Sequence, residues 1–87
     1  MRDGIVCLYN LFDMYQVVNE IKNGQLMPVG TMTLEELGKN IGKYCLTQNV
    51  NYIHLYGDLS YSKKIIEDID TVTNGLFSEK KIEIEVN

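Results

Sequence analysis

Hydrophobic and polar residues follow patterns that predict strands at three places in the chain. The segment 81–86, KIEIEV, alternates strictly, with two isoleucines and a valine on one side and two glutamates on the other. A period of two is typical of a strand with one buried face. Two short runs rich in β-forming residues, GIVCLYN at 4–10 and YIHLY at 52–56, also predict strands.

The pattern of residues 14–32 fits two structures. Apolar residues spaced three and four apart, from Met14 to Ile21, indicate one face of a helix that Asp13 would cap. Asn23–Gly24 is instead the strongest short signal for a hairpin. A two-residue turn there would pair Ile21 with Leu26, Val17 with Gly30 and Tyr15 with Met32. We favour the hairpin because tandem valines are stiff, β-forming residues, and the helix remains the alternative.

The segment from Thr33 to about Leu46 predicts a helix. Thr33 and Glu36 form a capping box, and apolar residues then recur at helical spacing. Gly38 and Gly42 lie four apart near this apolar stripe, and each costs up to about 1 kcal/mol relative to alanine. We expect that close approach of the helix backbone to the sheet compensates for this cost.

A second helix is predicted to begin near Ser60. A tyrosine and three isoleucines line one of its faces, and lysines and acids line the other. Residues 71–80 are then expected to form a loop that contains an Asn74–Gly75 turn.

Together these elements predict an α/β (α+β) fold with a five-stranded mixed sheet and the element order β-β-β-α-β-α-β. Strands joined through a helix are expected to be parallel, with right-handed crossovers. If the fourth and fifth strands advance in the same direction across the sheet, both helices fall mainly on one face. The opposite face of the sheet is then left open.

Length and composition predict one small domain, because the chain has 87 residues of which 45% are hydrophobic. The net charge of −4, with Arg2 as the only arginine, argues against nucleic-acid binding, which needs cations opposite the phosphates. No apolar run approaches about 18 residues, so we expect no membrane span. The N-terminal run lacks the features of a signal peptide. The sequence 1–87 therefore predicts a single-domain, acidic, cytoplasmic protein.

The two cysteines, Cys7 and Cys45, each lie within an apolar pattern, which predicts buried, reduced thiols. A structural zinc site needs about four ligands, and two cysteines and one histidine at scattered positions do not suggest one. The sequence therefore predicts no metal site and no cofactor.

The order of the elements resembles the ribonuclease H-like (actin-like ATPase-like) core, a three-stranded meander followed by αβαβ. The resemblance is topological and covers nearly the whole chain. Nucleases of this kind hold magnesium with a carboxylate cluster that includes an aspartate in the first strand. The matching strand here, IVCLY, contains no acid, although Asp58 matches one ligand position and Glu35 or Glu36 another. The resemblance implies such a fold without nuclease activity.

The small size and the richness in Asn, Ile, Lys and Tyr are similar to those of accessory proteins of phages and mobile elements from AT-rich bacteria. Many such proteins bind and block a host or defence protein. This resemblance implies an inhibitory, anti-defence role.

Candidate contact residues lie on the predicted open face. In the strand at 52–56, Tyr52, His54 and Tyr56 point away from Ile53 and Leu55. On the last strand, Glu83 and Glu85 are expected to share that open face. Tyrosines are enriched in binding hot spots, which makes this face a candidate partner-binding surface. The alternative is a solvated face, or one covered by the long loop.

The long loop contains an apolar pair, Leu76 and Phe77. Such a pair either fills the domain's own core or anchors a partner, so we include both residues among the candidate contacts.

The Gly57–Asp58 turn joins a strand to a helix, where ligands often bind in α/β folds. A small molecule or nucleotide held there, with Glu36, is the alternative site. A phosphate site would need more glycines and a Lys, Ser or Thr in place, and Asp58 adds a negative charge. The simpler interpretation is a turn at Gly57 and a helix cap at Asp58 or Ser60.

We predict a non-enzymatic protein-binding module that uses its open sheet face to bind another protein or a second copy of itself. The alternatives are a nucleotide-binding or degenerate hydrolase-like domain, and a structural subunit of a larger assembly.

Overall fold

Seven elements follow one another in the predicted order in the computed structural model, which describes residues 2–87. The strands are β1 (Gly4–Leu8), β2 (Tyr15–Lys22), β3 (Gln25–Thr33), β4 (Tyr52–Tyr56) and β5 (Glu83–Val86). The helices are α1 (Leu37–Gln48) and α2 (Leu59–Val72). The predicted α+β class and the element order are confirmed, whereas β1 and β5 are each two residues shorter than predicted.

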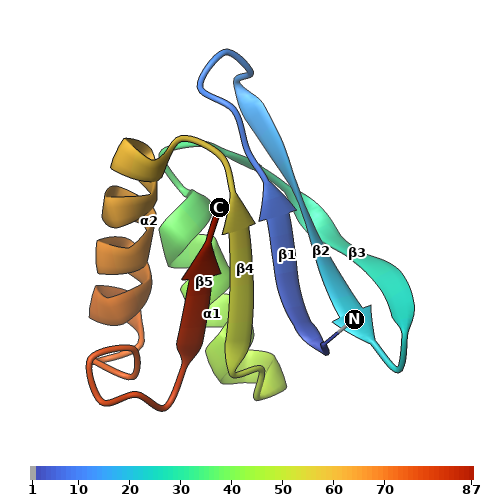
Figure 1. Ribbon diagram of the computed structural model, residues 1–87, viewed down its shortest axis with the longest axis vertical. Helices are drawn as coiled ribbons and strands as arrows, with labels where there is room; N and C mark the ends of the chain where they lie inside the picture. Colours follow the sequence, from blue (N-terminus) through green and yellow to red (C-terminus); the bar gives the residue numbers. More distant parts are fainter. Residues whose placement is uncertain (1) are drawn as a thin grey trace.

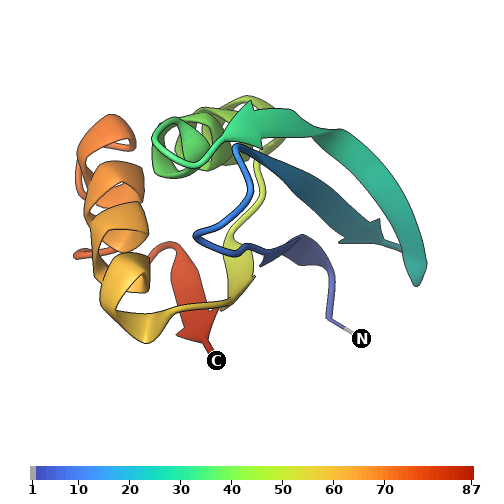
Figure 2. The same ribbon diagram turned by 90° about the horizontal axis from the view of Figure 1, so that it is seen from above.

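The five strands form one mixed sheet in the order β3-β2-β1-β4-β5. The pairings of β1 with β2 and of β2 with β3 are antiparallel. The pairings of β1 with β4 and of β4 with β5 are parallel. Figure 1 looks onto the open face, with α1 behind the strands. Figure 2 shows both helices on one side of the sheet and the β2–β3 hairpin curving away from them. One sheet face is therefore covered by helices and the other is open.

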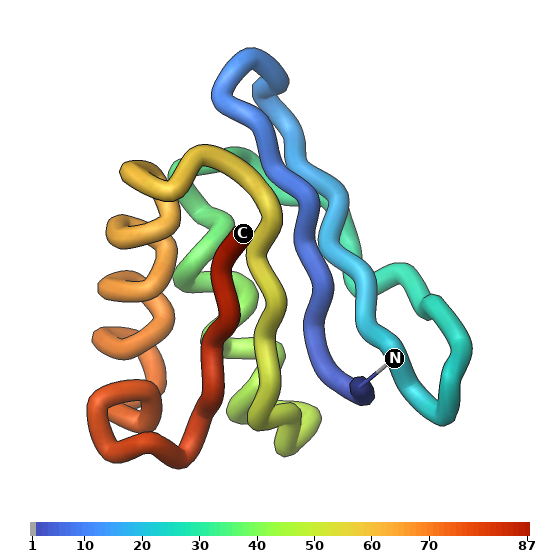
Figure 3. Tube along the Cα trace, in the orientation of Figure 1, coloured from blue at the N-terminus to red at the C-terminus, as the bar shows by residue number. Residues whose placement is uncertain are grey.

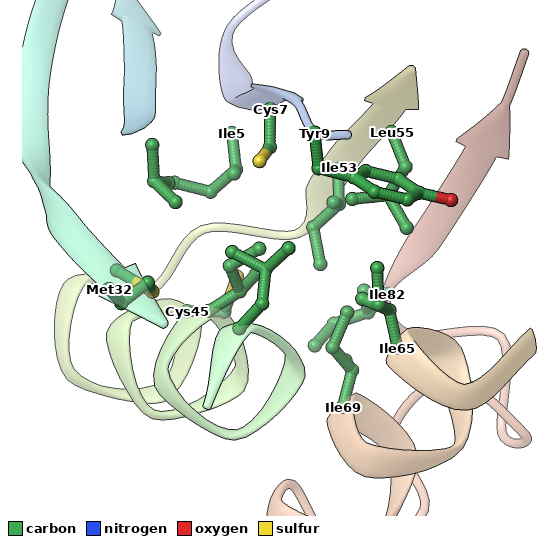
Figure 4. Packing of buried hydrophobic residues seen from close by; sticks show 13 residues of the cluster. Ile5, Cys7, Tyr9, Met32, Cys45, Ile53, Leu55, Ile65, Ile69 and Ile82 are labelled. Atoms are coloured by element: carbon green, nitrogen blue, oxygen red, sulfur yellow. The ribbon is translucent and has the colours of Figure 1, made fainter. Parts of the chain in front are cut away.

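The core lies between the helices and the inner face of the sheet (Figure 4). Alternate residues of the two central strands point into it, and they meet one face of each helix. The fully buried members include Ile5 and Cys7 of β1, Ile53 and Leu55 of β4, and Ile65 and Ile69 of α2. Within residues 2–87 neither helix is long and apolar enough to cross a membrane.

Both cysteines are free and buried, as predicted. Burial raises the pKa of the Cys7 thiol to about 11. Burial, and secondarily the negative charge of Glu20, raise the pKa of the Cys45 thiol to about 12. At neutral pH both side chains are therefore neutral thiols that act as small hydrophobic residues in the core.

Residues 15–22 form a strand, so the helix alternative for this segment is wrong. The Asn23–Gly24 turn has positive φ at both residues, 53° and 76°, as a type I′ hairpin turn requires. Ile21 pairs with Leu26 as expected. Beyond that point the predicted register is wrong by one residue, because Val17 pairs with Thr31 and Tyr15 with Thr33.

A β-bulge at Val29 causes this shift, since Asn19 pairs with Pro28 and Val18 pairs with Gly30. Proline has no backbone N–H to donate to a ladder and is found at bulges and edges. The bulge moves Met32 to the helix-covered face, where it is buried opposite Gln16.

The predicted capping box precedes α1. The backbone N–H of Glu36 donates to the Thr33 hydroxyl at 3.3 Å, and the N–H of Thr33 donates to the Glu36 carboxylate at 3.4 Å. A turn occupies residues 34–36, and the helix begins only at Leu37, later than predicted.

The expectation that Gly38 and Gly42 approach the sheet is wrong, because they face α2. A Cβ on Gly38 would lie 2.6 Å from the Ile65 carbonyl oxygen, and one on Gly42 would lie 2.2 Å from a methyl group of Val72. The two glycines therefore allow direct contact between the helices, which compensates for their low helix propensity.

α2 ends at Val72, so the loop that follows it begins two residues later than predicted. The Asn74–Gly75 turn is present, with φ of 56° and 87°. Asp70 anchors this loop to the helix, because its carboxylate accepts hydrogen bonds from the backbone N–H and the hydroxyl of Ser78.

Candidate functional site

The outward-facing residues of β4 and β5 share the open face. Tyr52 lies opposite Glu83 and His54 lies opposite Glu85, while the intervening Ile53 is fully buried on the other face. The structure thus brings together five of the residues that we selected from the sequence: Tyr52, His54, Tyr56, Glu83 and Glu85.

His54 is held in place by its neighbours on this face. Its ring stacks on Tyr56 with 4.1 Å between centroids, and its Nε2 lies 2.6 Å from the side-chain amide nitrogen of Asn87. Its Nδ1 lies 3.3 Å from the Tyr56 hydroxyl and 3.5 Å from that of Tyr52. This arrangement fixes an aromatic surface, and none of these polar partners is a carboxylate that would support general base chemistry.

Tyr52 is covered by the N-terminal segment and is only 7% exposed. The guanidinium of Arg2 lies 4.0 Å from the centre of its ring and also forms an ion pair with Glu83 at 3.0 Å. Burial, and secondarily the carboxylate of Glu85, raise the pKa of Tyr52. His54 and Tyr56 are half-buried, so they offer more surface than Tyr52 to a partner.

An apolar groove runs beside these aromatic residues. We call it the open-face groove; it has a volume of about 340 Å³ and is lined by Val6, Leu8, Asn19, Ile21, Gly24 and Leu26. A smaller hollow of about 170 Å³ shares Val6 and Ile21 with it and extends under Tyr52, His54 and Tyr56. The two hollows form one continuous surface from β4 to the β2–β3 hairpin.

The most exposed apolar side chains of this groove are Leu8, 70% exposed, and Leu26, 64% exposed. Val17 is also exposed on this face, since it alternates with the buried Val18. None of the three is among the contact residues predicted from the sequence. Leu8 was recognisable in principle, because it follows Cys7 in the first strand and must point to the opposite face.

Leu76 and Phe77 lie beside β5, at the edge of the sheet. Leu76 packs against the core, and Phe77 is half-buried beside β5, where it lines a hollow of about 500 Å³ with Ser78, Lys80, Ile82, Glu83 and Ile84. This hollow shares Glu83 with the open face, but neither Tyr56 nor Leu8 lines it.

The three residues of the alternative ligand site have local structural roles. The buried ring of Tyr9 occupies the space beside Gly57, where a Cβ would lie 2.6 Å from ring atoms. The Asp58 carboxylate caps α2 by accepting from the N–H of Tyr61 at 3.0 Å, and Glu36 belongs to the capping box of α1. In the described part of the chain no group of three or more His, Cys, Asp or Glu side chains is placed to hold a metal ion.

The contact with Tyr9, rather than a need for backbone flexibility, explains why glycine occupies position 57 of the Gly57–Asp58 turn. The Tyr9 hydroxyl contacts the carbonyl oxygen of Asp58 and the hydroxyl of Ser62, and burial raises its pKa. The side chain of Tyr9 thus ties the end of β1 to the start of α2 and requires a residue without a side chain at position 57.

Neither a protein-family model nor a curated protein sequence matches this chain. The fold class, α+β with one face of a five-stranded mixed sheet uncovered, is the classification that the structure supports.

Proposed function

We propose that this chain is a non-enzymatic protein-binding module that holds its partner against the open face of its sheet. The observation that carries the proposal is the exposure of Leu8 on the central strand β1, beside the open-face groove. Central strands are usually covered on both faces or carry polar residues on the solvent side. A mostly exposed leucine at this place is a reason to expect a covering partner.

The energetic scale supports a specific complex. Full burial of a leucine or valine side chain contributes about 1.5–3 kcal/mol relative to full exposure. Leu8, Leu26 and Val17 would each gain a part of this on binding, because each is more than half exposed. The stacked pair His54 and Tyr56 adds rigid aromatic area, which loses little conformational entropy when a partner covers it.

Electrostatics favours a partner with basic residues at its rim. Glu85 lies on the β5 side of the face, where the neighbouring Glu83 is already paired with Arg2, and the chain carries a net charge of −4. Complementary charge accelerates association and selects among partners more than it adds affinity. In this role the module would act by occupying its partner's surface, which is the inhibitory action implied by the resemblance to small phage accessory proteins.

Capture experiments with matched variants test the proposal. The wild type, Leu8→Asp and Tyr56→Ser are each immobilised. The control is Leu46→Asp, which alters an exposed leucine of α1, on the helix-covered side of the sheet. We expect Leu8→Asp and Tyr56→Ser to lose a protein that wild type and Leu46→Asp retain. Light scattering shows whether that protein is a second copy of the chain. An identical set of captured proteins and an identical mass for all four chains would contradict the proposal.

A further inference from the structure

The loop between β1 and β2 carries a second group of exposed apolar side chains. It projects beyond the ends of the neighbouring strands, at the top of Figure 3. Phe12 is 97% exposed, and Leu11 and Met14 beside it are also exposed. A phenylalanine with almost its whole surface in water gains nothing from the fold of its own chain, so its place on this loop needs another explanation.

Hydrogen bonds within the loop fix the conformation of its backbone. Gln16, only 3% exposed, donates through its amide to the carbonyl oxygens of Asn10 at 2.9 Å and Asp13 at 2.8 Å. The side-chain oxygen of Gln16 accepts from the N–H of Asn10 at 3.1 Å. The Asn10 side chain in turn accepts from the N–H groups of Phe12 and Asp13, each at 2.9 Å.

This network holds the backbone of Phe12 in one conformation while its ring stays in water. Ordering a loop on binding costs free energy, and a loop that is already ordered avoids most of that cost. The buried Gln16 therefore holds the exposed apolar tip in a fixed shape, which lowers the entropic cost of docking it.

A groove lies at the base of this tip. It has a volume of about 570 Å³ and is lined by Leu11, Phe12, Asp13, Met14, Thr33, Leu34, Glu35 and Tyr61. The charged residues in its lining are Asp13 and Glu35, and both are acidic. Lys64 also lies beside the groove, 5.7 Å from the centre of the Tyr61 ring, but its ammonium is paired with Asp68 at 2.9 Å. The charges of Asp13 and Glu35 therefore leave the apolar tip and its groove with a net negative rim.

The negative rim selects among the possible occupants. A second copy of the chain packed tip against tip would bring Asp13 and Glu35 toward the same acids of its partner, and like charges repel. An anionic lipid surface is disfavoured for the same reason. A protein with an apolar cleft and lysine or arginine at its edge satisfies both the apolar and the charged parts of the surface.

We propose that the β1–β2 loop is a protein-docking site, in which Phe12, flanked by Leu11 and Met14, inserts into an apolar cleft whose rim carries lysine or arginine opposite Asp13 and Glu35. This inference does not depend on the open-face groove. The two surfaces involve different residues and can be altered separately.

The test uses the full chain and three variants: Phe12→Ser, Glu35→Lys and the control Leu46→Ser. Each is immobilised and exposed to a lysate of the organism that encodes it, and a protein that depends on Phe12 is purified for titration. We expect Phe12→Ser to weaken its binding at least about tenfold, as truncation of an aromatic hot spot does. Glu35→Lys should weaken binding and reduce its salt dependence, while Leu46→Ser should leave binding unchanged.

Several results would overturn the proposal. One is a set of captured proteins that Phe12→Ser does not change, including an empty set for the wild type. Another is Phe12-dependent binding to vesicles of phosphatidylcholine and phosphatidylserine, which would identify a lipid surface. A third is a Phe12-dependent dimer in sedimentation velocity.

Discussion

Leu8 at the end of β1 and Tyr56 at the end of β4 lie opposite each other on the open face of the sheet. Their neighbours one residue earlier, Cys7 and Leu55, are buried against the helices. At this level the same two strands are thus fully covered on one face, while on the other they carry an exposed leucine and a partly exposed tyrosine. This asymmetry is the structural basis for proposing a partner on the open face.

Replacing Gly57 with alanine should destabilise the fold. The new Cβ would lie within 2.7 Å of three ring atoms of Tyr9, a side chain that is buried and tied to Asp58 and Ser62. Overpacking of this kind costs about 1–3 kcal/mol of unfolding free energy, which urea denaturation measures. Gly30→Ala is the matched control, because nothing lies within 4 Å of its added Cβ. Equal stabilities of the two variants would show that Tyr9 does not occupy this space.

Gly38→Ala should destabilise the protein although alanine is the better helix former. The substitution gains up to about 1 kcal/mol in helix propensity. Its Cβ, however, would lie 2.6 Å from the backbone oxygen of Ile65 and 2.7 Å from the Cβ of Asp68, so the helices must separate. We expect a net loss of about 1–2 kcal/mol in chemical denaturation. Lys39→Ala, on the exposed side of α1, serves as the control, and a stabilised Gly38→Ala would contradict the direct contact between the helices.

Asp70 should make the loop after α2 sensitive to acid. Hydrogen bonds from the hydroxyl and then the backbone N–H of Ser78 lower the pKa of Asp70 below its usual value. A lowered pKa means that the folded state favours the carboxylate, so the stabilisation is complete above the unfolded pKa, near 3.9. It is lost as the pH falls through the folded pKa. The Tm difference between wild type and Asp70→Asn should therefore be constant above about pH 5 and shrink below about pH 4.

Thermal unfolding from pH 7 to pH 2.5 measures this difference. Ser78→Ala should behave similarly, since it removes one of the two donors. A Tm difference that stays the same over the whole range would mean that Asp70 does not stabilise the fold as a carboxylate.

Much of the fold follows from local sequence patterns. The strict alternation of residues 81–86, the capping box at Thr33 and Glu36, and the Asn23–Gly24 turn each predict their element correctly. These signals are local, because each depends on a few consecutive residues and on backbone geometry. The bulge at Val29 was not predicted, since a one-residue insertion into a ladder depends on the packing of both faces of the hairpin.

Contacts between distant segments account for the remaining differences. The sequence indicates that Gly38 and Gly42 permit a close approach, but not that the approaching backbone is α2. Gly57 likewise depends on Tyr9, which lies far away in the chain. On the open face, the alternation of β4 predicted the orientation of His54 and Tyr56. The cover that Arg2 provides for Tyr52 depends on tertiary structure, as does the exposure of Leu26 on the curved hairpin.

The dissociation constant of the captured partner tests the central proposal most directly. It is measured by calorimetric titration for wild type, for the double variant Leu8→Asp/Leu26→Asp and for the control Leu46→Asp. We predict at least about a tenfold weaker affinity for the double variant and wild-type affinity for the control, because only the former places charges in the open-face groove. Circular dichroism confirms that all three are folded. Equal affinities for the three folded chains would contradict the proposal that the open face binds the partner.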